Sequence, residues 1–398
     1  MKLLLRWVVR AALGLLALLA IFFAVLVAAN WRDEPLTPEA ARLLAPPVPP
    51  APDTPNAYNV LLGLTAPDGE DDAAVGRRLR DQLDRQFLQN PAHPQYSQLP
   101  TNQAFCSSDP GASCDWSKLR CPLQKGADCV AFYLGEQSHM QQVIAQQSVL
   151  RQRYRQFAQI PVFDEPPLLT ADEPLPAYPF LTQAAEMRLA EAVFTLNRGD
   201  LPTGADMLMQ EIRLHRRLLA SSSQLITQMI AVGMLCRDYA VLSNAIEHWP
   251  QLAGQATLAE AWLPLCAPEY DLSRVVESEA APWAKLIYSD IQEQRNHRFR
   301  LNDLAQGVQA MKEDQQLFGM PWYATLLASN FVLPNATINA RARQMNEDIR
   351  DIQGDAPTLE ARYQARMAAG RMVPWATWRF IRNPGEKACC ICLISIFL

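Results

Sequence analysis

Apolar residues recur at helical spacing along most of this chain. Residues 73–87 form a charged run in which three apolar positions are spaced by four, which predicts an amphipathic helix. Residues 137–160 repeat apolar positions at intervals of three, four and seven, and predict a second helix. Shorter apolar faces predict elements over 56–65 and 39–44. Each of these predicted elements is a helix and none rests on the alternating pattern of a strand. The sequence therefore predicts an all-α protein.

From Leu181 onward the pattern stays helical almost to the end. One helix is predicted over 181–197, and Gly199 is the signal that stops it. The next helix begins with Thr203 as its N-cap. The run over 224–249 is apolar on most faces, which is typical of a central helix. The helix–Gly–helix pair is similar to a tetratricopeptide hairpin, although no second copy follows at the period of such repeats.

Prolines divide these helical regions. Residues 35–55 contain eight prolines and predict a semi-stiff extended spacer. Residues 161–179 contain six, which indicates either a domain boundary or an extended strap across the helices. Three Pro-Trp pairs, starting at Pro282, Pro321 and Pro374, predict helix starts whose tryptophans pack on the core.

The N-terminus predicts a membrane anchor. Lys2, Arg6 and Arg10 precede an uncharged stretch over 11–29, which is long enough to cross the hydrocarbon core as a helix. The positive-inside rule places the N-terminus in the cytoplasm and everything after Asn30 outside it. A signal peptide cleaved after Ala29 is the alternative, but the stretch exceeds the usual length of a signal-peptide core.

Four cysteines lie within two dozen residues, at positions 106, 114, 121 and 129. Their spacing matches neither a zinc site nor a Cys-x-x-Cys redox motif, and an exported protein uses such sets as disulfides. A helix over 115–120 would hold Cys114 and Cys121 about 10 Å apart, too far to bridge. Of the three possible connectivities we therefore expect Cys106–Cys114 with Cys121–Cys129.

Cys236 and Cys266 are the next candidates for a disulfide, which would join two neighbouring helices. Cys389, Cys390 and Cys392 stand in an apolar tail and have no assigned role.

Charge and motifs exclude several classes of function. The net charge of −5, without a basic block, argues against nucleic-acid binding. The five histidines are scattered, and no zinc-protease, nucleophile-elbow, P-loop or dinucleotide motif occurs. We therefore expect no metal, no cofactor and no common catalytic set.

Acidic side chains offer a weaker route to catalysis. Asp271, Glu277 and Glu279 lie close together in sequence, whereas Glu186 and Glu191 are five apart on one helix and face different ways. Carboxylates on helices are usually solvated, and we assign none of them a catalytic role.

Basic residues gather at Arg213, His215, Arg216 and Arg217, and again from Arg295 to Arg300. The first group is a candidate site for a phosphate or carboxylate. An exposed helix face paired with nearby acids is the interpretation we prefer.

In its segment order, and in the stretch NAYNVLLGLTAPDGEDD, the chain resembles uncharacterised inner-membrane-anchored helical proteins of Gram-negative bacteria. The resemblance implies a periplasm-facing location and no assigned activity. The predicted segments are an anchor over 1–30, a linker over 31–57, a stapled helical subdomain over 58–160, a strap or linker over 161–180, a helical body over 181–384 and a tail over 385–398.

The function expected from these features is that of a non-catalytic envelope scaffold. It would be held in the inner membrane by residues 11–29 and would bind an unidentified envelope protein. The alternatives are an envelope hydrolase or lyase that uses helix-borne carboxylates, and a sensor of an anion or small metabolite.

Overall fold

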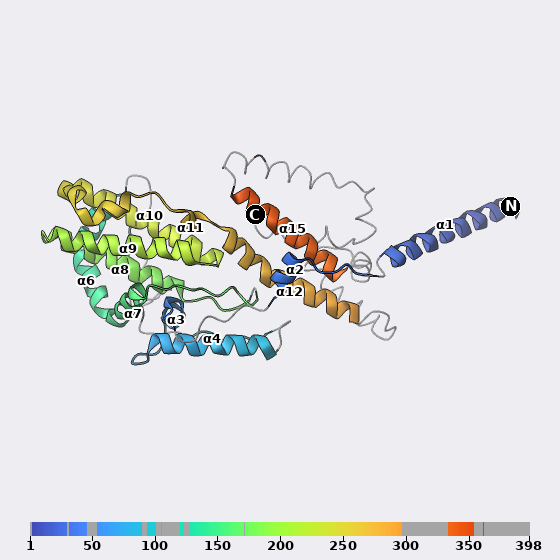
Figure 1. Cartoon of the computed structure of the whole chain (residues 1–398), viewed down its shortest axis with the longest axis horizontal. Coiled ribbons are helices and arrows are strands. Elements are labelled where there is room, and N and C mark those ends of the chain that lie inside the picture. The colour runs from blue at the N-terminus through green and yellow to red at the C-terminus, as the bar shows by residue number, and fades with distance from the viewer. Residues whose placement is uncertain are drawn as a thin grey trace. The chain divides into compact units, whose positions relative to one another are not determined.

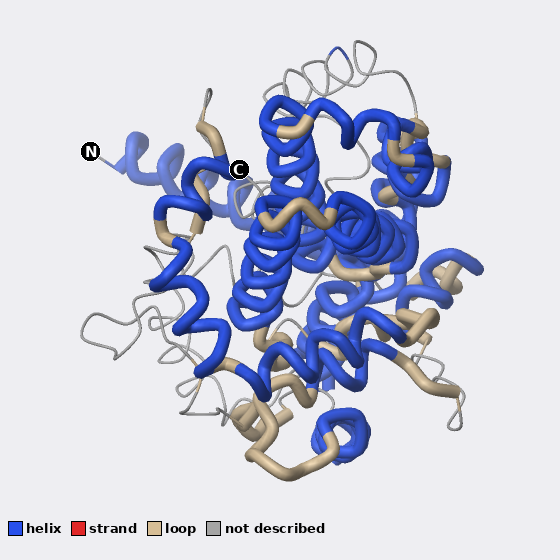
Figure 2. Tube along the Cα trace, turned by 90° about the vertical axis from the view of Figure 1, so that its left-hand side faces the viewer, coloured by secondary structure: helices blue, strands red, loops and turns tan. Residues whose placement is uncertain are grey.

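The computed structural model describes residues 2–29, 32–45, 54–89, 94–100, 105, 120–122, 127–170, 172–296, 333–353 and 361. Every regular element in these ranges is a helix (Figure 2), which confirms the all-α class. The helices are α1 Lys2–Ala29, α2 Pro38–Leu44, α3 Ala57–Leu62, α4 Asp72–Gln89, α5 Cys129–Gly135, α6 Gln137–Gln146, α7 Ser148–Gln159, α8 Tyr178–Asn197, α9 Leu201–Ser221, α10 Leu225–His248, η2 Pro250–Gly254, η3 Ala256–Trp262, α11 Ala267–Tyr270, α12 Ser273–Asn296 and α15 Pro334–Ile352.

Two compact units share the chain. The larger unit covers 47–279, and the smaller combines 1–46 with 280–398. In the larger unit α8, α9 and α10 lie side by side (Figure 1), α5–α7 pack on them, and α3 packs on α7 and α4. Its hydrophobic core takes in residues from both the predicted subdomain over 58–160 and the predicted body from 181, such as Phe157 and Leu208. The two segments therefore build one core.

A tight turn joins α8 to α9. Gly199 has φ of +87°, a conformation that glycine adopts without a steric penalty. The side chain of Asp200 accepts a hydrogen bond from the amide of Thr203 at 3.2 Å. The prediction of Thr203 as N-cap is wrong, because the chain enters the helix at Leu201 and the preceding aspartate caps it. The likeness of this hairpin to a tetratricopeptide unit stays a prediction.

The helix predicted over 137–160 is two helices. At Gln147 the backbone has ψ of 34°, outside the helical range, and separates α6 from α7. Neither glycine nor proline marks the break, so the apolar periodicity runs through it.

The proline-rich stretch after α7 is a strap. Asn56 and Asp164 exchange hydrogen bonds of 2.7 and 3.0 Å between side chain and backbone. The amide of Ala57 donates to the carbonyl of Val162 at 2.8 Å. These contacts hold residues 162–164 against the start of α3.

The Pro-Trp prediction fails at the pair that the structure describes. Pro282 lies inside α12, which begins at Ser273. A proline inside a helix costs one hydrogen bond but does not always end the helix. Trp322 and Trp375 lie outside the described residues.

One predicted disulfide is present. Cys121 and Cys129 are bonded, with their Cα atoms 5.5 Å apart, which confirms that half of the predicted pairing. The prediction for Cys236 and Cys266 is wrong. Both thiols are free and exposed, since Cys236 lies on the solvent face of α10 and Cys266 caps α11.

The remaining cysteines, at positions 106, 114, 389, 390 and 392, fall outside the described residues, as do the apolar tail and all but the last residue of the helix predicted over 115–120.

The smaller unit contains α1, and the large apolar side chains described along it are exposed. Within the described ranges, α10 is the one helix long and apolar enough to cross a membrane, and half of its most apolar stretch is buried in the core. Arg10–Phe22 is a shorter apolar helix. The structure thus provides no support for a crossing by 11–29, which stays a prediction.

The start of the predicted spacer is folded. The carboxylate of Asp33 accepts hydrogen bonds from the amides of Asn335 at 2.8 Å and Ala336 at 3.1 Å, at the start of α15. The side chain of Asn339 accepts from the amide of Thr37 at 2.8 Å, and α2 packs on α15. Residues 33–44 are therefore part of the smaller unit and not a free spacer.

Helices α3 and α4 touch through their backbones. A Cβ atom on Gly76 would lie 1.7 Å from the carbonyl oxygen of Asn59, and one on Gly63 would lie 2.0 Å from that of Asp72. Glycine inside α4 costs helix propensity, and the close crossing explains why it is there.

We predict that Gly76→Ala destabilises the protein by about 3 kcal/mol or more, because the methyl group meets backbone that cannot rotate away. Urea unfolding of the full chain, followed by circular dichroism, measures the effect. The matched control is Gly233→Ala on α10, where an added Cβ meets nothing within 4 Å. That change should be neutral or stabilise by up to about 1 kcal/mol. Equal effects of the two substitutions would show that the α3–α4 crossing is not as close as described.

Candidate functional site

A polar network runs through the core of the larger unit where α5, α7, α8, α9 and α10 meet. Its members are buried in the core, yet they carry hydroxyl, carboxylate, imidazole and guanidinium groups. They are Tyr133, Tyr154, Glu186, Glu211, His215, Arg237 and Asp238, all less than a tenth exposed. Buried charges need partners, and the network supplies them.

The pair at its centre joins α9 to α10. The Nδ1 atom of His215 lies 2.5 Å from a carboxylate oxygen of Asp238, and neither side chain is more than 1% exposed. Burial lowers the pKa of His215, but the charge and hydrogen bond of Asp238, together with Glu211, outweigh it and raise that pKa. Burial raises the pKa of Asp238.

Glu211 lies one helical turn before His215 on α9. The hydroxyl of Tyr154, on α7, donates to its carboxylate, and the guanidinium of Arg188 lies 3.9 Å away. Burial raises the pKa of Glu211 to about 7, against the opposing charge of His215. The hydrogen bond from Tyr154 and the charge of Arg188 limit this rise.

Glu186 extends the network to the disulfide. Its carboxylate pairs with Arg237 and accepts a hydrogen bond from Tyr133 at 2.5 Å. Arg237 also donates to the carbonyl of Cys121 at 3.2 Å. Cys121 is also bonded to Cys129. The disulfide therefore fixes the Cys121 carbonyl that accepts the hydrogen bond of the buried Arg237 guanidinium.

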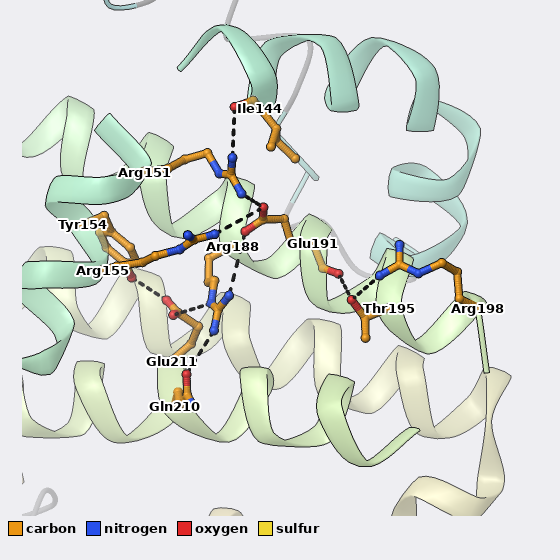
Figure 3. A network of polar contacts seen from close by, with 10 residues as sticks. All are labelled: Ile144, Arg151, Tyr154, Arg155, Arg188, Glu191, Thr195, Arg198, Gln210 and Glu211. Atoms are coloured by element: carbon orange, nitrogen blue, oxygen red, sulfur yellow. Dashed lines mark hydrogen bonds and ion pairs between the residues drawn. The ribbon is translucent and has the colours of Figure 1, made fainter. Parts of the chain in front are cut away.

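A second group of charges lies at the edge of this network (Figure 3). Arg151 and Arg155 project from one face of α7, and Arg188 comes from α8. All three guanidinium groups converge on Glu191, whose side chain is 18% exposed. We call Arg151, Arg155 and Arg188 the arginine rim. Glu186 and Glu191 thus have different partners, Arg237 for the first and the arginine rim for the second.

The basic residues predicted on α9 do not form one face. Arg213 pairs with Glu260 at 2.6 Å, and Arg217 donates to the carbonyl of Ala158 at 2.9 Å. His215 is buried against Asp238. The preferred prediction of an exposed, ion-paired side chain therefore fits Arg213, whereas His215 lies inside the core. The second basic run is not described beyond position 296.

Arg216 holds a surface segment over residues 262–270. It donates to the carbonyls of Leu263 at 3.0 Å and Pro264 at 2.9 Å, and its remaining N–H groups bind both carboxylate oxygens of Glu269. This contact lowers the pKa of Glu269 to about 2. The apolar side chains of the segment nevertheless face solvent, with Trp262 56% and Leu263 58% exposed.

The candidate catalytic carboxylates have structural partners. Glu279 accepts the amide of Leu225 at 2.9 Å at the start of α10, and Asp271 accepts that of Ser273 at 2.9 Å. Glu277 lies on α12. A surface hollow of about 430 Å³ is lined by residues 94–99, Asp172, Pro174 and Leu175, and its lining includes a single carboxylate. Within the described ranges no group of three or more acids, histidines or cysteines could hold a metal.

No protein family matches this sequence, and neither a curated protein nor a solved structure is significantly similar to it. The functional argument therefore rests on the geometry of this chain.

Sequence reasoning missed the buried network and the arginine rim. The signal for the first was a histidine four residues after a glutamate on a helix with an apolar face. For the rim it was the four-residue spacing of Arg151 and Arg155. Neither pattern shows which helix packs opposite it. The partner residues of the two clusters therefore could not be predicted from the sequence.

We predict that the protein is more stable at pH 5 than at pH 7.5. Burial raises the pKa of both Glu211 and Glu165 from 4.5 to about 7. Between these values the folded protein keeps protons that the unfolded chain has released, so the free energy of unfolding falls as pH rises. His215 acts in the same direction, because its raised pKa means that its stabilising charge is lost on going to higher pH.

Glu211→Gln keeps an acceptor for Tyr154 but cannot ionise. It should reduce the loss of stability between pH 5 and pH 7.5 by about 2 kcal/mol, measured by urea unfolding at both pH values. The control is Glu260→Gln, at a half-exposed acid, which should leave the pH dependence unchanged. The same pH dependence in Glu211→Gln and the unsubstituted protein would contradict the assignment.

Proposed function

We propose that this protein is a membrane-anchored interaction protein of the bacterial envelope, whose 262–270 segment binds a partner protein. The observation that carries the proposal is the way Arg216 fixes the backbone of that segment while its apolar side chains stay in solvent. Trp262, Leu263, Leu265 and Tyr270 are each more than 40% exposed. Exposed apolar side chains on a rigid backbone are typical of binding surfaces, where tryptophan and tyrosine dominate the energetics.

Local charge favours a protein over a lipid surface as the occupant. Glu260, just before the segment, is paired with Arg213, and Glu269, within it, is paired with Arg216. The segment thus carries no positive excess to attract anionic headgroups. An uncharged apolar patch is complementary to an apolar patch on another protein.

The anchor is the second element of the proposal. Helix α1 carries exposed apolar side chains, including Leu16 at 62% and Leu19 at 55%, and basic residues precede them. Together with the resemblance to inner-membrane-anchored helical proteins, this supports a single crossing with the N-terminus in the cytoplasm and the larger unit in the periplasm. The disulfide fits an oxidising compartment.

We predict that charges in the middle of α1 detach the protein from membranes. The double variant Leu16→Arg and Leu19→Arg adds about 5 kcal/mol to the cost of insertion, which should move the full chain from the pellet to the supernatant after alkaline carbonate extraction. Trp7→Arg, near the end of the helix, is the control and should stay in the pellet. A mature chain that begins at Asn30 would instead show a cleaved signal peptide and would contradict the anchor.

We also predict that the partner binds through the 262–270 segment. Tagged full-length protein is cross-linked in native membranes and recovered, and the co-purified proteins are quantified by mass spectrometry. Replacing Trp262 and Leu263 by serine should reduce a stoichiometric partner at least about tenfold, as expected for loss of central apolar contacts. Leu88→Ser, at a leucine 72% exposed on α4, is the matched control. Equal recovery with both variants would contradict this surface.

A further inference from the structure

The arginine rim gathers three cations around one acid. One oxygen of Glu191 faces Arg151 and Arg155, and the other faces Arg188. Glu211, beneath Arg188, is the second carboxylate in contact with the rim. Three guanidinium groups therefore meet two carboxylates, and the site keeps a positive excess even with both acids ionised.

The hydrogen-bonding capacity of the rim is also underused. Arg155 and Arg188 lie 3.9 Å from the oxygens of Glu191, which is an ion pair but too long for a hydrogen bond. Arg188 donates instead to Gln210 at 3.0 Å. Within the described part of the chain Arg155 has no hydrogen-bond partner, and the buried Nε of Arg151 has none either.

The rim is open on one side and closed on the other. Arg155 is 53% exposed, whereas Arg151, Arg188 and Glu191 are about one fifth exposed. Tyr154 and Glu211 lie beside the rim (Figure 3), and both are buried. Each of the three arginine side chains therefore keeps some contact with solvent, and Arg155 keeps the most.

From this arrangement we infer that the arginine rim binds a phosphoryl group, either of a free phosphate compound or of a lipid headgroup. A tetrahedral oxyanion accepts hydrogen bonds from several directions, which matches the forked donors of Arg151, Arg155 and Arg188. Glu191 occupies the rim as an internal anion and competes with the ligand. The inference goes beyond the proposed function and does not depend on it, because the rim and the 262–270 segment share no residue.

The test is a titration of the purified full chain with inorganic phosphate at constant ionic strength, balanced with chloride. Binding is followed by calorimetry and by the rise in melting temperature that a ligand of the folded state causes. Arg155→Gln should weaken binding at least about tenfold, the loss expected for one charge-assisted hydrogen-bonding group. Because Arg155 is half exposed, this variant is expected to fold.

Two further variants make the test specific. Arg213→Gln removes the same charge from an arginine that is 47% exposed and paired with Glu260, and it should bind phosphate like the unsubstituted protein. Glu191→Gln removes the competing anion and should bind several times more tightly. An absence of phosphate binding in both the unsubstituted protein and Glu191→Gln would overturn the inference. So would equal weakening by Arg155→Gln and Arg213→Gln.

Competition separates the two sources of the phosphoryl group. Glycerol 3-phosphate and the soluble short-chain lipid dihexanoyl phosphatidic acid are each titrated against bound phosphate. Stronger competition by the lipid assigns the site to a headgroup, and equal competition assigns it to a free phosphate compound. Failure of both to displace phosphate would contradict recognition of a phosphoryl group.

Discussion

The larger unit depends on one buried carboxylate in the strap. One oxygen of Glu165 accepts the amides of Ser223 and Gln224, both at 2.9 Å, just before α10 begins. The other accepts the hydroxyl of Thr227 at 2.6 Å. An acid at this place accepts hydrogen bonds from amides that a helix start leaves without partners. A negative charge there also interacts favourably with the positive end of the helix dipole. The strap therefore fixes where the central helix begins.

The position of α10 then determines which charged side chains pair with one another in the core. Arg237 and Asp238 are adjacent on this helix, and they meet Glu186 on α8 and His215 on α9. A shift of α10 would leave a buried cation and a buried acid without partners, which costs more than the loss of the same apolar contacts. The network thus specifies how α8, α9 and α10 align.

Helix α9 connects this interior to the surface. His215 and Arg216 are neighbours in sequence, yet one binds Asp238 in the core and the other holds the 262–270 segment. Successive residues on a helix are about 100° apart, so a single helix can serve both sides. The alignment that the buried pair imposes is therefore also the alignment with which the surface segment is presented.

The helices were predictable from the sequence where apolar periodicity was strong, as for α4, α8 and α10. The pairing of Cys121 with Cys129 also followed, because it rests on local spacing. Predictions failed where the deciding contact came from elsewhere in the chain. Gln147 interrupts a periodic helix without a local signal, and Asp200 caps α9 in place of Thr203. Residues 33–44 read as a spacer because their partners on α15 lie about 300 positions later.

The two basic clusters show the same limit of prediction from sequence, here for the placement of charge. The sequence concentrates basic residues at 213–217, but consecutive positions point in different directions and each meets its own partner. Arg151 and Arg155 are spaced by one helical turn and share a face, and Arg188 joins them only through the packing of α7 on α8. Charge density along a sequence therefore locates helix surfaces, whereas a positive excess in space depends on which acids the fold brings near. In this protein that excess lies at α7 and α8, next to a carboxylate that already occupies the place of an anion.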